Sequence, residues 1–325
     1  MLDVISKYYE PNVLDPSNNE AYMEMIEKSK AAVFYVDILG MGALTKQELK
    51  LTRSDYIPWL KKNRDEFNPE YLAAAILAEF RRILTSLIPK YRNVTVSQLS
   101  DCAFIWSADI CAVVKFAAEF MQIAIRKGVF CRGGLTYGEI IETNENHKLG
   151  RFIVGPAVTS AVKLEKIAKG ARILIDEGFP AYLWDYCKIF SERTEPLFSP
   201  FTNPLDYEIY DEFKWYLIPF ERIGELDLRL LDHNEKVEFT KYRLMLANQV
   251  RLSPRFSWNT KSTQGCIQLK ATVNFMAENN LLGICHDYAW TNLGEKRSMK
   301  IVDNVGSGIS NDDNYNFSNS KTTGT

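Results

Sequence analysis

The stretch Phe34-Tyr35-Val36-Asp37-Ile38-Leu39-Gly40 decides how the rest of the chain is interpreted. β-Branched and aromatic side chains fill residues 33–36, which favours a buried strand, and Gly40 with Gly42 ends that strand in a sharp turn. Asp37 is therefore expected at the end of a strand. A single carboxylate there does not indicate a functional site unless a second acidic group lies close to it.

Asp101 is the best candidate for that second carboxylate. It follows Ser100 at the joint between two strand-like runs, residues 93–99 and 102–106. If the strands that end at Asp37 and at Asp101 are neighbours in one sheet, the two carboxylates come close enough to share divalent ions.

Composition restricts the class of protein without naming its function. The chain has 325 residues, 46% of them hydrophobic, and a formal net charge of -2. This is an ordinary globular composition for one large domain or two smaller ones, and it gives no general electrostatic reason to expect a nucleic-acid polymer as partner. A small anionic ligand needs only local charge and stays possible.

Targeting signals are absent from the sequence pattern. No apolar run reaches the ~20 residues that span a bilayer, and the first residues lack a basic segment followed by an apolar one. The six cysteines include no C-x-x-C pair, so we interpret them as reduced thiols. We expect a cytoplasmic protein without a membrane span.

Hydrophobic periodicity predicts an α+β fold. From residue 31 to 176 the order is strand, helix, strand, strand, helix, strand, strand, helix, strand, and the first six elements are the βαββαβ order of ferredoxin-like folds. The predicted strands are 31–39, 93–99, 102–106, 129–143, 151–154 and 171–176, and the predicted helices are 68–90, 110–127 and 155–169.

The pattern changes near residue 190, which divides the chain. We expect a connection over 194–206, a strand over 215–220, and helices over 233–252 and 263–280. The predicted divisions are an N-terminal segment 1–30, a core domain 31–190, a mixed α/β and helical C-terminal extension 191–300 of unassigned role, and a disordered tail 301–325.

Four short motifs, taken in order, resemble the catalytic domain of class III nucleotidyl cyclases. They are Phe-x-x-Asp-Ile-x-Gly (34–40), Ser-Asp (100–101), Arg-x-Gly-Leu-x-x-Gly (132–138) and Gly-x-x-Val-x-x-Ala-x-x-Leu-Glu (155–165). Each motif alone is weak, and their order and placement at strand ends, hairpin and helix start make the set specific. The resemblance covers roughly residues 30 to 180 and implies that the core domain is catalytic.

The resemblance implies roles for the first two motifs. Asp37 and Asp101, with the Ile38 carbonyl, would hold two divalent ions, Mn²⁺ or Mg²⁺, that bind a nucleoside triphosphate. The backbone of Gly40, Met41 and Gly42 would approach the phosphates. Arg132, Gly134 and Gly138 are interpreted as hairpin architecture and dimer packing rather than as catalytic groups.

This sequence departs from the family pattern at the positions that recognise the base and at those that bind the ribose and stabilise the transition state. Ser97 stands where the family commonly reads a purine with Lys or Glu, and Phe152 aligns with the partner position, so the purine-reading pair is absent. Thr159 and Lys163 align with the family's Asn and Arg. Thr can still hydrogen-bond a ribose and Lys can supply positive charge, although Lys163 can also be a solvent-facing helix residue.

Retained metal carboxylates beside a lost purine pair are similar to one branch, the bacterial antiphage pyrimidine cyclases of the Pycsar systems. That resemblance implies a uridylate cyclase that makes cyclic UMP as a signal for a separate effector. Cytidylate cyclase, adenylate or guanylate cyclase, and an inactive nucleotide-binding module are the alternatives. The family also implies a homodimer in which Thr159 and Lys163 act in trans to Asp37 and Asp101.

Overall fold

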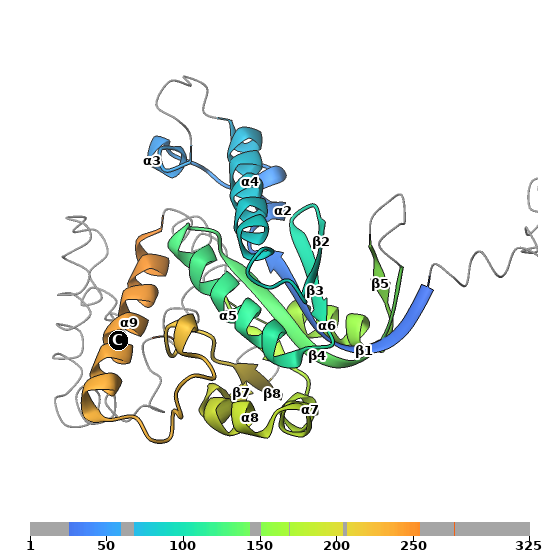
Figure 1. Ribbon diagram of the computed structural model, residues 1–325. Coiled ribbons are helices and arrows are strands. Elements are labelled where there is room, and N and C mark those ends of the chain that lie inside the picture. The colour runs from blue at the N-terminus through green and yellow to red at the C-terminus, as the bar shows by residue number, and fades with distance from the viewer. Residues whose placement is uncertain are drawn as a thin grey trace, which may run out of the picture.

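A single mixed sheet with helices on both faces organises the chain (Figure 1). The computed structural model describes residues 26–59, 68–143, 151–168, 170–203, 207–253 and 276. Eight strands form the sheet, in the order β2-β3-β1-β4-β6-β8-β7, with the short β5 paired to β4. The predicted α+β class is confirmed.

The first six predicted elements form the ferredoxin-like core. β1 lies between β3 and β4 and runs antiparallel to both, which is the pairing expected of a βαββαβ unit. The structure extends the first strand by five residues at its N-terminal end, from 31 to 26. The core elements are β1 (Ile26–Ile38), α4 (Pro69–Leu87), β2 (Thr95–Leu99), β3 (Cys102–Ser107), α5 (Ile110–Arg126) and β4 (Cys131–Thr143).

Helices α4 and α5 cover one face of this core. Each begins at a polar cap, since the Asn68 side chain accepts from Glu70 N and the Asp109 side chain accepts from Ala112 N. Alternate residues of β1 point to this face and are fully buried, and Phe34 packs edge-on against Phe120 of α5. The apolar spacing that predicted the two helices is the spacing of the side chains they bury.

Helix α6 (Pro156–Ile167) covers part of the opposite face. It approaches β4 so closely that a Cβ added to Gly134 would lie 2.0 Å from the Ala161 carbonyl oxygen. The Thr136 hydroxyl donates to the Ala157 carbonyl at 2.8 Å, which also ties the helix to the strand. α6 packs on β4, β1, β6 and β5, and it leaves the part of this face made by β2 and β3 uncovered.

The sheet continues beyond residue 190 with two strands that the sequence did not predict. β6 (Ile173–Ile175) runs parallel to β4, β8 (Ile209–Phe213) pairs with β6, and β7 (Phe198–Thr202) forms the edge. The predicted connection 194–206 therefore contains a strand. The division near residue 190 stays a prediction, with the sheet running across it.

The predicted strand over 215–220 is wrong. Residues 215–219 form turns, followed by a 3-10 helix, Phe220–Arg222. Their apolar side chains are buried around Gln122 of α5, whose amide donates to the Trp215 and Ile218 carbonyls and accepts from the Phe220 N–H. Two carbonyls and one N–H of this segment are therefore satisfied by one side chain instead of by a neighbouring strand.

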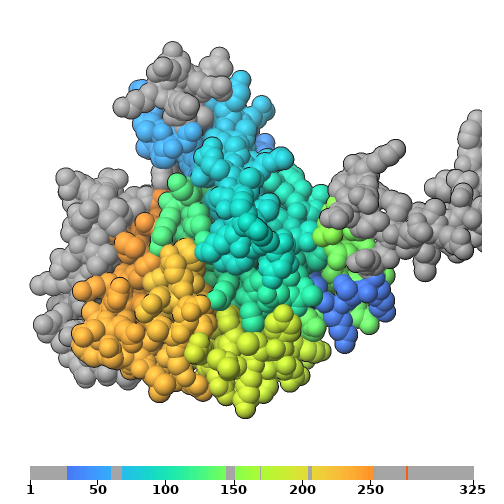
Figure 2. Space-filling model, viewed as in Figure 1, coloured from blue at the N-terminus to red at the C-terminus, as the bar shows by residue number. Residues whose placement is uncertain are grey.

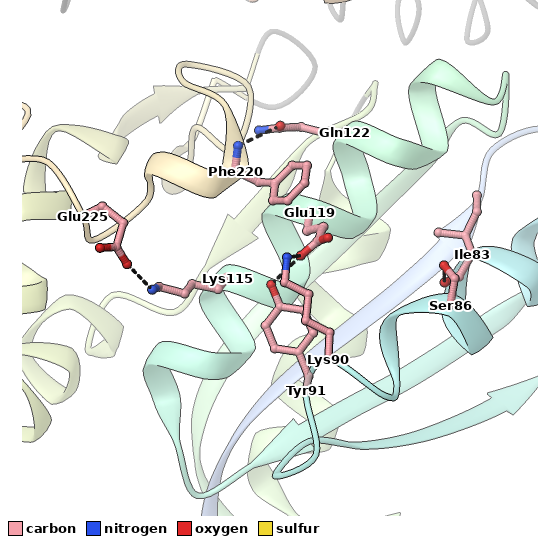
Figure 3. A network of polar contacts seen from close by, with 9 residues as sticks. All are labelled: Ile83, Ser86, Lys90, Tyr91, Lys115, Glu119, Gln122, Phe220 and Glu225. Carbon is pink, nitrogen blue, oxygen red and sulfur yellow. Dashed lines mark hydrogen bonds and ion pairs between the residues drawn. The ribbon is translucent and has the colours of Figure 1, made fainter.

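A network of polar contacts holds this C-terminal part against α5 (Figure 3). Buried Glu119 accepts from Lys90 at 2.5 Å and from the Tyr91 hydroxyl at 2.6 Å, and the Lys90 ammonium lies over the Phe220 ring. Burial and the bond to Glu119 raise the pKa of Tyr91. On the same side, Lys115 pairs with Glu225 at 3.2 Å.

The remaining elements surround the core. The predicted helix over 233–252 is confirmed as α9 (His233–Leu252), which lies beside α5 (Figure 2, orange). The predicted helix over 263–280 and the predicted disordered tail lie outside the described residues, apart from Met276. No helix among the described ranges is long and apolar enough to cross a bilayer. The shorter elements are α2 (Met41–Thr45), α3 (Arg53–Tyr56), β5 (Ile153–Val154), α7 (Phe179–Tyr186) and α8 (Lys188–Thr194).

Candidate active site

The structure brings Asp37 and Asp101 together. Asp37 is the penultimate residue of β1 and lies directly opposite Cys102 of β3, and Asp101 is the residue before Cys102 in the β2–β3 turn. The Asp101 carbonyl accepts from the Ile38 N–H at 3.0 Å, so the turn is fixed to the end of β1. The strand adjacency that the sequence required of the two carboxylates is present. Their role as metal ligands stays a prediction.

Arg132 and Glu165 complete a charged cluster around Asp37. Arg132 of β4 lies opposite Asp37 on its other side, and its guanidinium is 4.0 Å from the Asp37 carboxylate. The same guanidinium donates its Nε–H to Glu165 of α6, a carboxylate that is 4% exposed. Arg132 therefore lies between two acidic groups and is closer to Glu165.

The cluster holds more negative charge than Arg132 neutralises. Burial, with the neighbouring charges of Glu165 and Asp101, raises the pKa of Asp37 to about 7, while Arg132 acts in the opposite direction. The Asp37 side chain is 25% exposed, so it is reachable from solvent. A partly buried carboxylate that retains its proton near neutral pH is a group that a cation would stabilise in its ionised form.

These donors fit a hard divalent ion only in part. Carboxylate oxygens are the ligands that Mg²⁺ and Mn²⁺ prefer. In the part of the chain that the structure describes, no group of three or more His, Cys, Asp and Glu side chains is arranged around one ion position. Two aspartates would therefore need oxygens from the backbone, from water or from a bound phosphate to complete the coordination.

An aromatic pair lies one step along the strands from Asp37. Tyr35 of β1 and Phe104 of β3 are opposite one another, with ring centroids 4.6 Å apart, and both pack against a small apolar cluster that includes Ala157 and Ala161 of α6. Ser97 of β2 lies opposite Phe104 and continues the same row. Burial and a hydrogen bond to Cys102 raise the pKa of Tyr35, so its hydroxyl stays protonated.

Phe152 is exposed at the edge of this face, next to β5. Its N–H donates to the Thr143 hydroxyl at 3.1 Å. The adjacent Arg151 donates to Thr95, which is two residues before Ser97 on β2. The structure therefore places the segment that carries Phe152 on the same side of the sheet as Ser97.

The glycine motif begins a short helix. Gly40 has a φ of 79°, in the left-handed region that favours glycine, and it caps α2. Met41 is buried in the core and Gly42 has open space around its α-carbon. The approach of this backbone to phosphates stays a prediction.

Thr159 and Lys163 lie on the outer side of α6. Both are exposed, whereas Ala157, Ala161 and Glu165 of the same helix are buried toward the sheet. One turn separates the two outer residues, so they share one face. That face points away from the sheet that carries Asp37, and within one chain the structure does not bring Lys163 to the carboxylates.

Three residues of the cluster were missed or differently interpreted by sequence reasoning. Arg132 was interpreted as architecture, yet it faces Asp37. Glu165 closes the fourth motif, but its contact with Arg132 depends on how α6 docks. Tyr35 lies two residues before Asp37, and strand alternation alone places both on one face, which was the available signal.

No family model matches the chain, and no curated protein matches it. Among solved structures, the chain is similar to the adenylyl cyclase CyaB from P. aeruginosa, with 17% identity over 57% of this chain and 95% of that chain and a TM-score of 0.40. It is also similar to the guanylyl cyclase Cya2, with 12% identity over 58% of this chain and 92% of that chain and a TM-score of 0.40. A third is the guanylyl cyclase domain of the RhoGC fusion protein from the aquatic fungus Blastocladiella emersonii, with 16% identity over 58% of this chain and 97% of that chain and a TM-score of 0.37.

Proposed function

We propose that this protein is a nucleotidyl cyclase of the class III type that converts UTP to 3′,5′-cyclic UMP and pyrophosphate. The observation that carries the proposal is the pair of carboxylates, Asp37 and Asp101, at the joined ends of β1 and the β2–β3 turn. In the reaction the ribose 3′-oxygen forms a bond to the α-phosphorus, and the bond from that phosphorus to the oxygen it shares with the β-phosphate breaks. Pyrophosphate leaves with that oxygen, and the 3′-hydroxyl proton passes to solvent.

Asp37, Asp101 and the Ile38 carbonyl are the groups proposed to hold the divalent ions. Two such ions, Mn²⁺ or Mg²⁺, would lower the pKa of the 3′-hydroxyl and offset negative charge on the phosphates. Arg132 and Glu165 fix the surroundings of Asp37, and Gly40, Met41 and Gly42 form the turn beside it. The excess negative charge around Asp37 supports this assignment.

The orientation of α6 supports a homodimer with shared sites. Thr159 and Lys163 are exposed on the side of α6 that faces away from their own sheet, so they would reach the Asp37 of a second copy. There the Thr159 hydroxyl would hydrogen-bond the ribose. Lys163 would place a positive charge near the α-phosphate, where negative charge accumulates.

The uncovered half of the sheet supports a pyrimidine as the base. Ser97 offers neither the Lys nor the Glu with which the family reads purines, and the Tyr35–Phe104 pair occupies space beside it. Phe152 adds an aromatic side chain on the same side of the sheet. UTP is the proposed substrate, with CTP as the next candidate.

The biological role proposed with this activity is that of a cytoplasmic signal generator in antiphage defence. The cyclic nucleotide would act on a separate effector protein. This part of the proposal rests on the likeness of the motifs to the Pycsar branch. The catalytic domain proposed over 31–190 and the extension beyond it share one sheet, so both would be required for a folded enzyme.

The experiment is incubation of the purified protein with each ribonucleoside triphosphate and Mn²⁺, followed by identification of the product. We expect cyclic UMP from UTP. Conversion of ATP or GTP alone would contradict the pyrimidine assignment, and nucleotide binding without any cyclic product would favour the inactive module.

Variants test the residues in the same assay. Asp37→Ala and Asp101→Ala should each abolish cyclisation while retaining the fold, and Asp185→Ala, at an exposed carboxylate of α7, is the matched control. Lys163→Ala should lower kcat more than it raises KM. Full activity in any one of the three test variants would remove that residue from the proposed site.

A further inference from the structure

A groove lies between α4 and the edge strand β2, on the face of the sheet opposite to Asp37. Figure 1 shows the helix and the strand that border it. Its volume is about 560 Å³, which is within the range of sites that bind small organic ligands. The hollow exists because Ala74 and Ala78 present almost no side chain where α4 passes β2. Leu77, Ile88 and Val96 make its apolar walls.

The groove has one charged group among its lining residues. That group is Arg81, and in the described part of the chain no hydrogen bond or ion pair involves its guanidinium. The next residue, Arg82, lies outside the groove and is paired with Glu79. An apolar hollow with one unpaired guanidinium is complementary to a molecule with an apolar body and one acidic group.

One end of the groove is the turn that carries Asp101. Gln98 and Ser100 both line it, and the Gln98 amide donates to the Ser100 carbonyl at 2.9 Å. Ser100 is held at a φ of 55°, a left-handed conformation that is strained for a residue other than glycine. The turn that positions Asp101 therefore depends on a side chain that a ligand in the groove would contact.

We infer that this groove binds a small amphiphilic organic anion and that the bound anion strengthens the metal site through Gln98. The apolar part of the ligand lies against Leu77, Ile88 and Val96, and its acidic group pairs with Arg81. A glutamine amide has two N–H groups, so Gln98 donates one to the ligand and keeps the other on the Ser100 carbonyl. A fixed Gln98 holds the strained turn, and with it Asp101, in place.

Binding is tested with the fluorescent probe 8-anilino-1-naphthalenesulfonate, which combines aromatic rings with one sulfonate. We expect saturable binding at one site per chain. Arg81→Gln should weaken it roughly tenfold, the size of one charge-assisted hydrogen bond, and Arg82→Gln should leave it unchanged. Ala78→Trp should abolish it by filling the groove.

Melting curves would test whether the variants fold, and Ala78 is exposed in the wall of the groove, so a larger side chain there displaces no buried core residue. If Ala78→Trp does not fold, the comparison of Arg81→Gln with Arg82→Gln still decides the question. Equal affinity in these two variants, or binding that never saturates, would overturn the groove as a ligand site.

The coupling to the metal site rests on the proposed function and has its own readout. Mn²⁺ should tighten probe binding about fivefold, because coupling between two sites is reciprocal. Gln98→Met should weaken probe binding only by the loss of one hydrogen bond and should remove the effect of Mn²⁺. Asp37→Ala should leave probe binding without Mn²⁺ unchanged and should also remove the effect of Mn²⁺. An unchanged dissociation constant with Mn²⁺ in the unaltered protein overturns the coupling. A failure to cyclise any nucleotide would appear in the separate product assay and would leave the binding result intact.

Discussion

At the scale of single residues, Asp37 is held in a destabilised ionised state. Its carboxylate lies between Asp101 and the Arg132–Glu165 pair, and burial with like charges raises its pKa to about 7. The folded protein therefore binds a proton at Asp37 more tightly than the unfolded chain, where the ordinary value of 3.8 applies. Stability from this group is present at low pH and is lost as pH rises from about 4 through about 7.

The first prediction follows from this loss of stability as the pH rises. In a metal-free buffer with a chelator, Asp37→Asn should raise the melting temperature relative to the unaltered protein at pH 8. The gain should be much smaller at pH 5, because Asp37 is then protonated and already neutral in the fold.

The control is Asp185→Asn, which replaces an exposed carboxylate and should change the melting temperature equally little at both pH values. A difference between Asp37→Asn and the unaltered protein that does not depend on pH would contradict the position of Asp37 in a crowded acidic cluster.

Residue-level prediction from sequence succeeds where local geometry is sufficient. A strand that ends before a glycine turn placed Asp37, and a hairpin turn placed Asp101 beside it. The Arg132–Glu165 contact could not be predicted in the same way, because it joins a strand to a helix 33 residues later whose docking is set by packing. The groove beside Arg81 could not be predicted from the sequence either, because it is the space left between α4 and β2 after they pack.

At the scale of elements, the contact of β4 with α6 determines how the site is assembled. Gly134 lets the helix backbone rest directly on the strand, and Glu165 reaches Arg132 only because of that close approach. The glycine therefore positions the acidic cluster although it touches none of its charges.

The second prediction is that Gly134→Ala disrupts this contact. The new Cβ would lie 2.0 Å from the Ala161 carbonyl oxygen, a backbone atom that cannot move without shifting the helix. We expect unfolding free energy to fall by on the order of 3 kcal/mol, measured by urea denaturation. Gly42→Ala is the matched control, because no atom lies within 4 Å of its added Cβ. Equal stability of the two variants would contradict the tight docking of α6.

Elements were predictable where caps and periodicity agree, as in α4, α5, α6 and α9. The predicted strand over 215–220 failed because an apolar run has no period that distinguishes a strand from a buried turn. β7 was missed because an edge strand with Pro200 and polar neighbours resembles a loop until its partner β8 is known.

At the scale of the whole molecule, the two halves of the proposed site lie on opposite sides of α6. One chain offers Asp37 on its sheet and Lys163 on its outer surface, so a complete site needs two chains. This arrangement makes a prediction that does not depend on knowing the substrate's base.

The third prediction concerns mixed dimers. Asp37→Ala and Lys163→Ala chains should each be inactive or weakly active alone. When they are co-expressed in equal amounts, about half of the dimers contain one chain of each kind, and each of these has one intact site of two. Activity should therefore return to about a quarter of that of the unaltered protein.

The measurement is cyclic nucleotide production by the purified mixture, with Asp37→Ala and Asp101→Ala chains co-expressed as the control. That second mixture should stay inactive, because both changes damage the same half of the site. Equal activity of the two mixtures would show that Lys163 does not complement Asp37 across a dimer.

The docking of α6 has a consequence for cooperativity between substrate molecules. On the inner side of α6, Glu165 interacts electrostatically with the Asp37 of its own chain. On the outer side, Lys163 would contact the nucleotide in the other site of the dimer. Helix α6 has twelve residues and packs directly on Gly134, so Glu165 and Lys163 would move together. Filling one half of the dimer would then shift the affinity of the other, and saturation curves would depart from a simple hyperbola.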